Sequence, residues 1–232
     1  MLPLSDHLPR RTTPVINYLL IAANIFMFVW ELSLGPDIER TLFAVAFIPA
    51  RFWYSPDLAN IFTMFVSMFL HGGWIHLGGN MLYLWIFGDN VEDRLGHGKY
   101  LFFYFICGIA ATMAHAVMNP ASRIPSIGAS GAIAGVLGGY IVMFPRARVT
   151  TLIPIFVFIT VREIPAVVVL GFWFVFQLLV ATASRGVAGV EEAGGVAYFA
   201  HIGGFIVGMI LVIVMGGLRR SAQPVPYNDF WR

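Results

Sequence analysis

The sequence predicts an all-α fold: a polytopic membrane protein in which six transmembrane helices pack as one bundle. Three observations support this prediction. Hydrophobic residues make up 59% of the 232 residues and charged residues only 11%, whereas about a quarter of the residues in a soluble domain are charged. The apolar residues gather in runs of roughly the 20 residues that a helix needs to cross a bilayer. The basic residues lie mostly between these runs and are unevenly distributed.

Each expected span follows from its length and its boundaries. The first comes after a polar segment with Arg10 and Arg11 and lacks a small-residue cleavage site, which indicates a retained span rather than a signal peptide. Pro145 ends the fourth span, and Arg219 closes the sixth. The expected spans are residues 15–34, 75–91, 100–118, 130–144, 165–182 and 196–218.

These spans divide the chain into three parts. Residues 1–14 are an N-terminal segment, residues 15–218 the membrane domain and residues 219–232 a C-terminal tail. Within the membrane domain, residues 61–70 are apolar but too short to cross a bilayer. Residues 35–74 are therefore expected to form a long first loop that is partly embedded in the membrane.

The basic residues predict the orientation. With an even number of spans both termini lie on one side, and that side holds ten of the fourteen Lys and Arg residues. Because cytoplasmic loops carry the excess of basic residues, both termini are expected to be cytoplasmic. The ten are Arg10, Arg11, Arg94, Lys99, Arg146, Arg148, Arg162, Arg219, Arg220 and Arg232, and the other four are Arg40, Arg51, Arg123 and Arg185.

Composition argues against several kinds of partner. No basic tract indicates nucleic-acid binding. Cys107 is the only cysteine, so an internal disulfide is impossible. Without a second thiolate or an H-E-x-x-H motif, we expect no metal site and no cofactor. His115, near the outer end of the third span, is expected to be a packing or interfacial residue.

Three predicted helices carry polar residues that are costly in a membrane and by default mark function. They are His76 and Asn80 in the second span, Ser130 in the fourth and His201 in the sixth. His76, Ser130 and His201 each lie sixteen to eighteen residues, or about 24 to 27 Å, from the charged inner end of their helix. We therefore expect them in one layer in the outer half of the membrane. His76 and Asn80 are four residues apart and project from one helix face.

Glycines are expected to let the fourth and sixth spans approach closely. Gly131 with Gly135, and Gly204 with Gly208, have the small-xxx-small spacing that permits near contact of helix backbones. The spacing alone is common in membrane helix packing. A short serine side chain, however, reaches a histidine on another helix only if the two helices are this close.

A serine beside a histidine indicates nucleophilic catalysis. An imidazole has an unperturbed pKa of about 6.5, so it can accept the serine proton as the oxygen attacks a carbonyl. His76, Asn80 and the backbone N–H of Ser130 are candidate donors to the resulting oxyanion.

No carboxylate is expected to complete a triad. Three acidic residues lie at the inner ends of the helices, about 20 Å or more from the serine layer, and two in the last outer loop are not required by their spacing to approach it. The sequence therefore predicts a dyad of Ser130 and His201 rather than a Ser-His-Asp arrangement. The acidic residues are Asp89, Glu92, Asp93, Glu191 and Glu192.

Several motifs together are far more specific than any one of them. They are Gly128-x-Ser130-Gly131, His71 with His76-x-x-x-Asn80, Ala200-His201-x-x-Gly204-x-x-x-Gly208, and Glu92-Asp-Arg94-Leu-Gly96 after the second span. The first three motifs lie on the fourth, second and sixth predicted spans. Together the motifs resemble the rhomboid family of intramembrane serine proteases, in its bacterial six-helix form. The resemblance covers residues 15–218.

The resemblance implies a role for each matching residue. Ser130 would be the nucleophile and His201 the general base and acid. His76, Asn80 and the Ser130 amide would form the oxyanion hole, while His71 would make a structural hydrogen bond in the loop. The glycines Gly128, Gly131, Gly204 and Gly208 would be motif and packing residues.

The resemblance also implies an activity and a place. The chain would be a serine endopeptidase of a bacterial inner membrane, cutting single-span membrane proteins near the outer end of their helix without a cofactor. The active site would open to the outer side, with the fifth helix and residues 183–195 as lateral gate and cap. Substrates with Gly or Pro beyond the cut would unwind more readily.

Two other functions are compatible with parts of the pattern. A non-catalytic rhomboid-like protein would bind or move membrane clients, but such relatives usually lack the serine or the histidine, and this chain keeps both. A transporter or channel would line a permeation path with the polar layer. The sequence does not favour this function, because it shows no internal repeat and no charged residue at the midplane.

Overall fold

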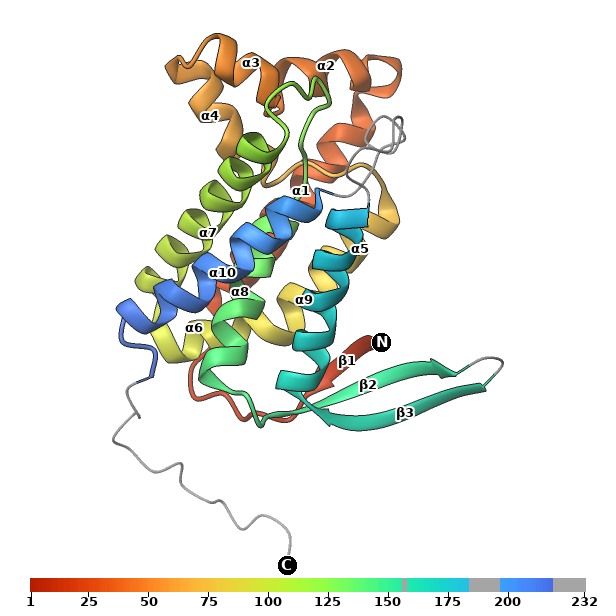
Figure 1. Ribbon diagram of the computed structural model, residues 1–232, viewed down its shortest axis with the longest axis vertical. Coiled ribbons are helices and arrows are strands. Elements are labelled where there is room, and N and C mark those ends of the chain that lie inside the picture. Colours follow the sequence, from red (N-terminus) through yellow and green to blue (C-terminus); the bar gives the residue numbers. More distant parts are fainter. Residues whose placement is uncertain (156–157, 184–196, 219–232) are drawn as a thin grey trace, which may run out of the picture.

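The computed structural model describes residues 1–155, 158–183 and 197–218, and most of them are helical (Figure 1). The expected cap and tail fall largely on residues outside these ranges. The helices are α1 (Val15–Ser33), η1 (Gly35–Asp37), α2 (Ile38–Val45), α3 (Pro49–Tyr54), α4 (Leu58–Ser67), α5 (Trp74–Tyr83), η2 (Leu84–Gly88), α6 (Asp89–Leu95), α7 (His97–Met118), α8 (Ser130–Met143), α9 (Ala166–Ala183) and α10 (Tyr198–Val214), and the strands are β1 (Leu2–Asp6), β2 (Arg148–Ile155) and β3 (Phe158–Pro165).

Helical structure lies over each of the six predicted spans. Among the described residues, α1, α7 and α9 are long and apolar enough to cross a membrane. The helices α8 and α10 are apolar but shorter. The second predicted span corresponds to α5, η2 and α6 together. A membrane protein of mostly helical structure is thus confirmed, and six membrane crossings stay a prediction.

The second predicted span is one continuous helix with a π-helical turn in its middle. Leu84 and Asp89, at the two joints, keep right-handed helical backbone angles. The Asn17 amide of α1 donates to the Leu84 carbonyl at 3.0 Å. A Cβ at Gly88 would lie 2.1 Å from Asn17 Oδ1, so the glycine leaves room for the Asn17 side chain against the turn.

The predicted first loop is itself partly helical and contains η1 and the short α-helices α2, α3 and α4. The Asp57 side chain caps α4 by accepting the Asn60 N–H at 2.8 Å. At the other end of α4, Ser67 Oγ accepts the Phe47 N–H at 2.6 Å. The loop is therefore folded back on itself, and its end at Ser67 is fixed.

A three-stranded antiparallel sheet, in the order β1-β2-β3, is an addition to the all-α prediction. Residues 150–160 are an apolar run too short for a span and rich in Ile, Thr and Phe, which favour strands. Pairing Thr151 with Arg162, and Leu2 with Leu152, gives the run backbone partners. Figure 1 shows the sheet at the end of the bundle opposite α2, α3 and α4.

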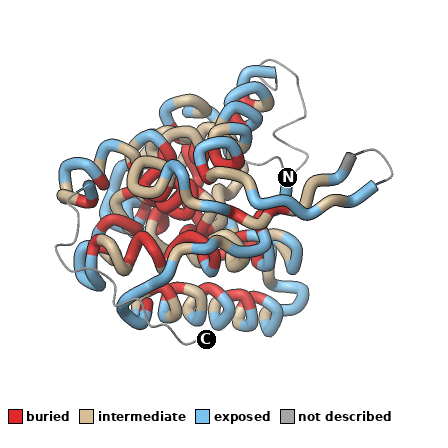
Figure 2. The backbone as a smooth tube through the Cα atoms, turned by 90° about the horizontal axis from the view of Figure 1, so that it is seen from below, coloured by how far each residue is buried: buried red, intermediate tan, exposed pale blue. Residues whose placement is uncertain are grey.

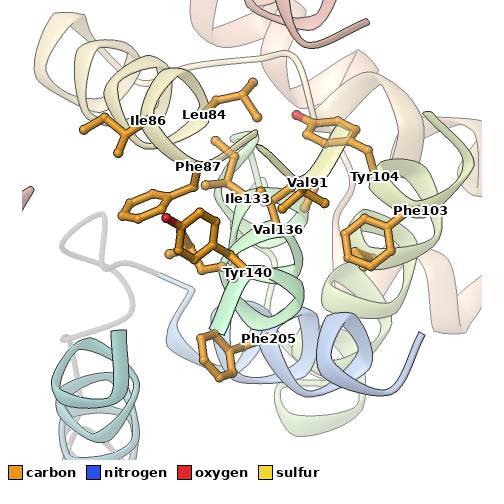
Figure 3. Packing of buried hydrophobic residues seen from close by; sticks show 14 of the residues in the cluster. Leu84, Ile86, Phe87, Val91, Phe103, Tyr104, Ile133, Val136, Tyr140 and Phe205 are labelled. Carbon is orange, nitrogen blue, oxygen red and sulfur yellow. The ribbon is translucent and has the colours of Figure 1, made fainter. Parts of the chain in front are cut away.

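The centre of the bundle is α8. Every residue from Gly131 to Tyr140 is buried, and the buried positions in Figure 2 gather in the interior of the bundle. Around α8 lie aromatic side chains of its neighbours, as Figure 3 shows. The rings of Phe87 and Tyr140 meet edge to face with centroids 4.9 Å apart. The helix that begins at Ser130 is therefore held by packing on all its sides.

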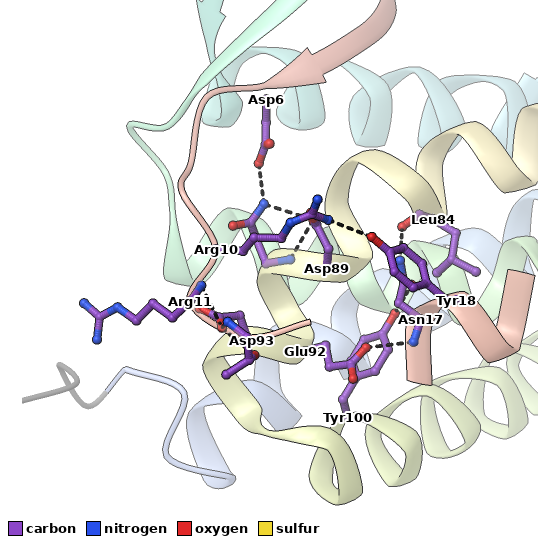
Figure 4. A network of polar contacts seen from close by, with 12 residues as sticks. Asp6, Arg10, Arg11, Asn17, Tyr18, Leu84, Asp89, Glu92, Asp93 and Tyr100 are labelled. Carbon is purple, nitrogen blue, oxygen red and sulfur yellow. Dashed lines mark hydrogen bonds and ion pairs between the residues drawn. The ribbon is translucent and has the colours of Figure 1, made fainter. Parts of the chain in front are cut away.

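A network of polar contacts ties the start of α1 to α6 (Figure 4). The Glu92 side chain is buried and accepts the backbone N–H groups of Ile16 at 3.0 Å and Asn17 at 2.7 Å. These N–H groups lie in the first turn of α1, where a helix has no acceptors of its own. Asp93 likewise accepts the Thr12 N–H at 2.8 Å. The acidic residues after the second span thus have structural partners far from Ser130.

Asp6 joins the sheet to the helices. Its Oδ2 accepts the Tyr140 hydroxyl at 2.6 Å and the Asn90 side-chain amide at 2.8 Å. Burial, together with the nearby Asp89, raises the pKa of Asp6 from 3.8 to about 6, although the Tyr140 hydrogen bond opposes this shift. The folded state therefore holds a proton on Asp6 more tightly than the unfolded chain does.

Replacing Asp6 by Asn should change how stability depends on pH. Between about pH 4 and pH 6 the folded parent binds more protons than the unfolded chain, so its free energy of unfolding falls as pH rises. The Asp6→Asn variant keeps an oxygen acceptor for Tyr140 and lacks this term, so its Tm relative to the parent should rise across that window. Exposed Asp37→Asn is the control. A Tm difference between Asp6→Asn and the parent that does not vary with pH would contradict this account.

Candidate active site

Ser130 and His201 meet at the junction of two helices. Ser130 is the first residue of α8, and His201 lies in the first turn of α10. Their side chains are in hydrogen-bond contact, with Ser130 Oγ 2.8 Å from His201 Nε2. His201 is buried, and Ser130 is half-buried. The two residues predicted to form a catalytic pair are therefore in the geometry that proton transfer between them needs.

Glycines allow this contact. A Cβ on Gly204 would lie 2.1 Å from the carbonyl oxygen of Gly131, and one on Gly208 would lie 2.1 Å from that of Gly135. Real side chains do not approach a backbone atom so closely, so α8 and α10 could not keep this separation with any larger residue there. The structure thus places all four glycines of the predicted spacings in one contact between the two helices.

Gly128, two residues before Ser130, meets a second requirement. Its φ of +123° lies in the region that favours glycine. A Cβ there would also lie 2.8 Å from His76 Nε2 and 3.7 Å from Ser130 Oγ. The Gly128 N–H donates to the Ser67 carbonyl at 2.8 Å. This hydrogen bond fixes the segment just before Ser130 against the end of α4. The motif glycine therefore leaves room for the His76 ring beside the serine.

His71 and Asn80 form a second polar unit behind His76. His71 Nδ1 lies 3.2 Å from the Phe69 carbonyl, and its Nε2 lies 3.0 Å from Asn80 Nδ2. Since the carbonyl only accepts, Nδ1 carries the proton and Nε2 accepts from Asn80. The His71 and His76 rings are in edge contact with centroids 5.1 Å apart. His71 thus orients Asn80, in keeping with the structural role expected for it.

Glu31 of α1 is a buried acid that was not among the predicted site residues. Both Glu31 carboxyl oxygens lie near the His71 backbone N–H, at 3.0 and 3.2 Å, and Glu31 is fully buried. An acidic residue within an apolar span is costly, and this was a signal that could have pointed to it. Glu31 therefore fixes the backbone at His71, in the segment that leads into α5 and His76.

A further residue that was not among the predicted site residues contacts His201. Gln177 of α9 places its Oε1 2.8 Å from His201 Nδ1. One turn earlier on α9, the Trp173 ring lies against the imidazole with centroids 5.8 Å apart. Both ring nitrogens of His201 therefore have a partner, and the partner on α9 is a neutral side chain. The signal was a lone amide in the apolar run of α9.

A cavity of about 1090 Å³ surrounds these groups. Ser130, His201, His76 and Asn80 all line it. Other lining residues come from α5 and α9, so the cavity extends between these helices; they include Ile75, Tyr83, Trp173 and Ala181. His115 lines the cavity too, in contact with Asn119. The four residues of the predicted polar layer thus line one cavity.

The remaining expectations concern acids and metals. Asp89, Glu92 and Asp93 belong to the polar network around the start of α1, and Glu191 and Glu192 lie outside the described residues. Among the described residues, no group of three or more His, Cys, Asp or Glu side chains could hold a metal ion. Among the described residues, the hydrogen-bond acceptor beside His201 Nδ1 is the side-chain amide of Gln177.

The fold and site define a helical membrane protein with a Ser–His pair inside a cavity of the bundle. The family model called Rhomboid domain matches residues 58–218, which is more than half of the chain. The chain therefore belongs to the rhomboid family.

Named relatives agree with this assignment. The chain is 30% identical over 217 residues to the mitochondrial Rhomboid protein 1 of Saccharomyces cerevisiae, covering 89% of this chain and 56% of that protein. It is 31% identical over 211 residues to Rhomboid protease GluP of Bacillus subtilis, covering 88% of this chain and 35% of that protein. A mitochondrial presenilin-associated rhomboid-like protein of Bos taurus is 29% identical over 155 residues, which are 64% of this chain and 38% of that protein. The chain thus spans about half or less of these relatives.

Gly208→Ala should separate α8 from α10. Because the new methyl group would lie 2.1 Å from the Gly135 carbonyl oxygen, the helices must move apart, and we expect a loss of about 1 to 3 kcal/mol in stability. The matched control is Gly78→Ala on α5, where a Cβ meets nothing within 4 Å. Thermal unfolding in detergent is the measurement. Equal Tm values for the two variants would contradict the packing described above.

Proposed function

We propose that the chain is an intramembrane serine endopeptidase that cuts single-span membrane proteins near the outer end of their helix. The observation that carries the proposal is the 2.8 Å contact between Ser130 Oγ and His201 Nε2, inside a cavity of a helical membrane protein. Membership of the rhomboid family supports it, as does the name of the Bacillus subtilis relative, a rhomboid protease. No cofactor is required for this chemistry.

In the proposed first step, His201 Nε2 takes the proton of Ser130 as Oγ attacks the carbonyl carbon of the substrate. The resulting imidazolium then gives this proton to the leaving amine nitrogen, which breaks the peptide bond and leaves an acyl group on Ser130. A water molecule, deprotonated by His201, attacks the acyl carbon in turn. Ser130 recovers its proton when the acid product leaves.

Three donors are proposed for the oxyanion: His76, Asn80 and the backbone N–H of Ser130. His76 Nδ1 accepts the Gly72 N–H at 3.3 Å, so its Nε2 carries the proton and is the end near Gly128. Asn80 has two amide hydrogens, and His71 uses one of them. The Ser130 N–H lies at the start of α8, where N–H groups lack an acceptor within the helix.

The shape of the cavity supports a membrane protein as substrate. Since α5 and α9 both line it, a substrate helix in the bilayer would approach between them. A helical peptide bond is shielded by its own hydrogen bonds, so the substrate must unwind before Ser130 attacks. Residues that weaken a helix, such as Gly and Pro, lower the free energy of this unwinding by about 1 to 3 kcal/mol each.

We further propose the bacterial six-helix form, with both termini cytoplasmic and the site open to the outer side of an inner membrane. The distribution of basic residues supports this orientation. The described basic residues of the larger group include Arg148 and Arg162 on the sheet, whereas Arg40 and Arg51 lie on α2 and α3 at the opposite end (Figure 1). The relatives come from mitochondria and a chloroplast as well as a bacterium, so the compartment rests on the sequence.

Ser130→Ala should abolish cleavage of a single-span test protein by the purified chain in detergent, by about 10⁴-fold or more. His201→Ala should cost a similar factor, and the double variant little more, because the two groups act as one unit. Ser33→Ala, at an exposed position of α1, is the control and should cleave like the parent.

Cleavage by Ser130→Ala at the parent rate would overturn the proposed function. A parent that is folded but neither cleaves nor reacts with a fluorophosphonate would favour a non-catalytic, client-binding protein instead. Flux through liposomes that survives Ser130→Ala would favour a transporter or channel.

A further inference from the structure

We infer that Gln177 is a positioning residue, which holds the His201 ring in the tautomer and orientation that its reaction with Ser130 requires. The inference rests on the proposed function and names a contributor that lies outside the rhomboid motifs of this chain. The geometry that carries it is a continuous line of contacts from Gln177 Oε1 through the imidazole to Ser130 Oγ, with both distances at 2.8 Å.

The direction of the hydrogen bonds determines the tautomer of His201. An amide oxygen only accepts, so the 2.8 Å contact with Gln177 Oε1 requires the proton of the neutral ring on His201 Nδ1. The lone pair of Nε2 then faces Ser130 Oγ. This is the tautomer that a general base for Ser130 must have. The opposite tautomer would place an N–H where the serine proton has to arrive.

His201 and Gln177 are both buried. The exposed fraction is 6% for His201 and 7% for Gln177, so water has little access to their contact. A buried amide without a partner costs about 1 to 3 kcal/mol. Gln177 lies on the otherwise apolar helix α9, and its hydrogen bond to His201 removes this cost. The same hydrogen bond restricts the rotation of the His201 ring.

The face of α9 that carries Gln177 restrains the His201 ring at a second point. Trp173, Gln177 and Ala181 are spaced by four and lie on one face. Trp173 covers the imidazole at an interplanar angle of 35°, while Gln177 takes its edge. A single helix thus restrains the ring in two directions, and the position of α9 sets the orientation of the base.

Gln177 is a neutral residue, which suits its place within a membrane. In a soluble serine protease a carboxylate occupies the position of Gln177 and stabilises the imidazolium. Within a membrane a buried carboxylate carries a large desolvation penalty. An amide supplies the acceptor without that penalty, but it stabilises the imidazolium less. Gln177 therefore orients the base more than it changes the charge balance of the site.

Two substitutions separate orientation from packing. Gln177→Leu keeps a similar volume and removes the acceptor, and Gln177→Glu restores an acceptor with a charge. Leu179→Ala, on the exposed face of the same helix, is the control. The readouts are kcat and KM on a single-span test protein across the pH range of imidazole titration, with thermal unfolding to establish folding.

For Gln177→Leu we expect kcat to fall on the order of ten- to a hundredfold with little change in KM, as follows from the loss of one buried hydrogen bond. For Gln177→Glu, which keeps an oxygen acceptor at this position, we expect kcat closer to that of the parent than the kcat of Gln177→Leu. Leu179→Ala should match the parent. A folded Gln177→Leu with parental kcat would overturn the inference.

The tautomer also has a readout that needs no turnover. In nitrogen NMR of histidine-labelled protein, with the His201 signals identified by their absence from His201→Ala, the parent should show the proton on Nδ1, and Gln177→Leu should lose this preference. A parent with the proton on Nε2 overturns the inference whatever the activity. If the Nδ1 tautomer is found but the parent shows no Ser130-dependent cleavage, the proposed function fails and the positioning of His201 by Gln177 stands.

Discussion

The close approach of α8 and α10 is the constraint on which the rest of the site depends. Gly204 and Gly208 lie against the carbonyls of Gly131 and Gly135 with no room for a side chain. Within the bilayer no hydrophobic effect pulls helices together, so contact of this kind is a main source of association. Because the backbones touch, a side chain as short as that of Ser130 reaches a histidine on the next helix.

Several polar groups of the candidate site are arranged as pairs. His201 is bound on both nitrogens, His71 joins Asn80 to the loop, and Glu31 holds the His71 backbone. Each unpaired group in this environment would cost several kcal/mol. The pairing stabilises the fold and also leaves few orientations open to the rings, so stability and preorganisation have the same source.

Much of this could be predicted from the sequence because the signals are local. Apolar run length gave the helices, polar residues at equal depth gave Ser130 and His201, and glycine spacing gave the α8–α10 contact. The partners of Gln177 and Glu31 could not be predicted, since they are set by how distant helices pack, although each residue stood out as polar in an apolar run. The β2–β3 hairpin was missed because a short apolar run is equally compatible with a strand, a loop or part of a helix.

The central claim is that the proximity of His201 makes Ser130 a nucleophile. It is tested most directly by treating the folded protein with a fluorophosphonate and locating the adduct by peptide mass spectrometry. The account predicts a single adduct on Ser130 in the parent and at most a trace in folded His201→Ala. An adduct elsewhere in the chain, or equal labelling of Ser130 with and without His201, would contradict it.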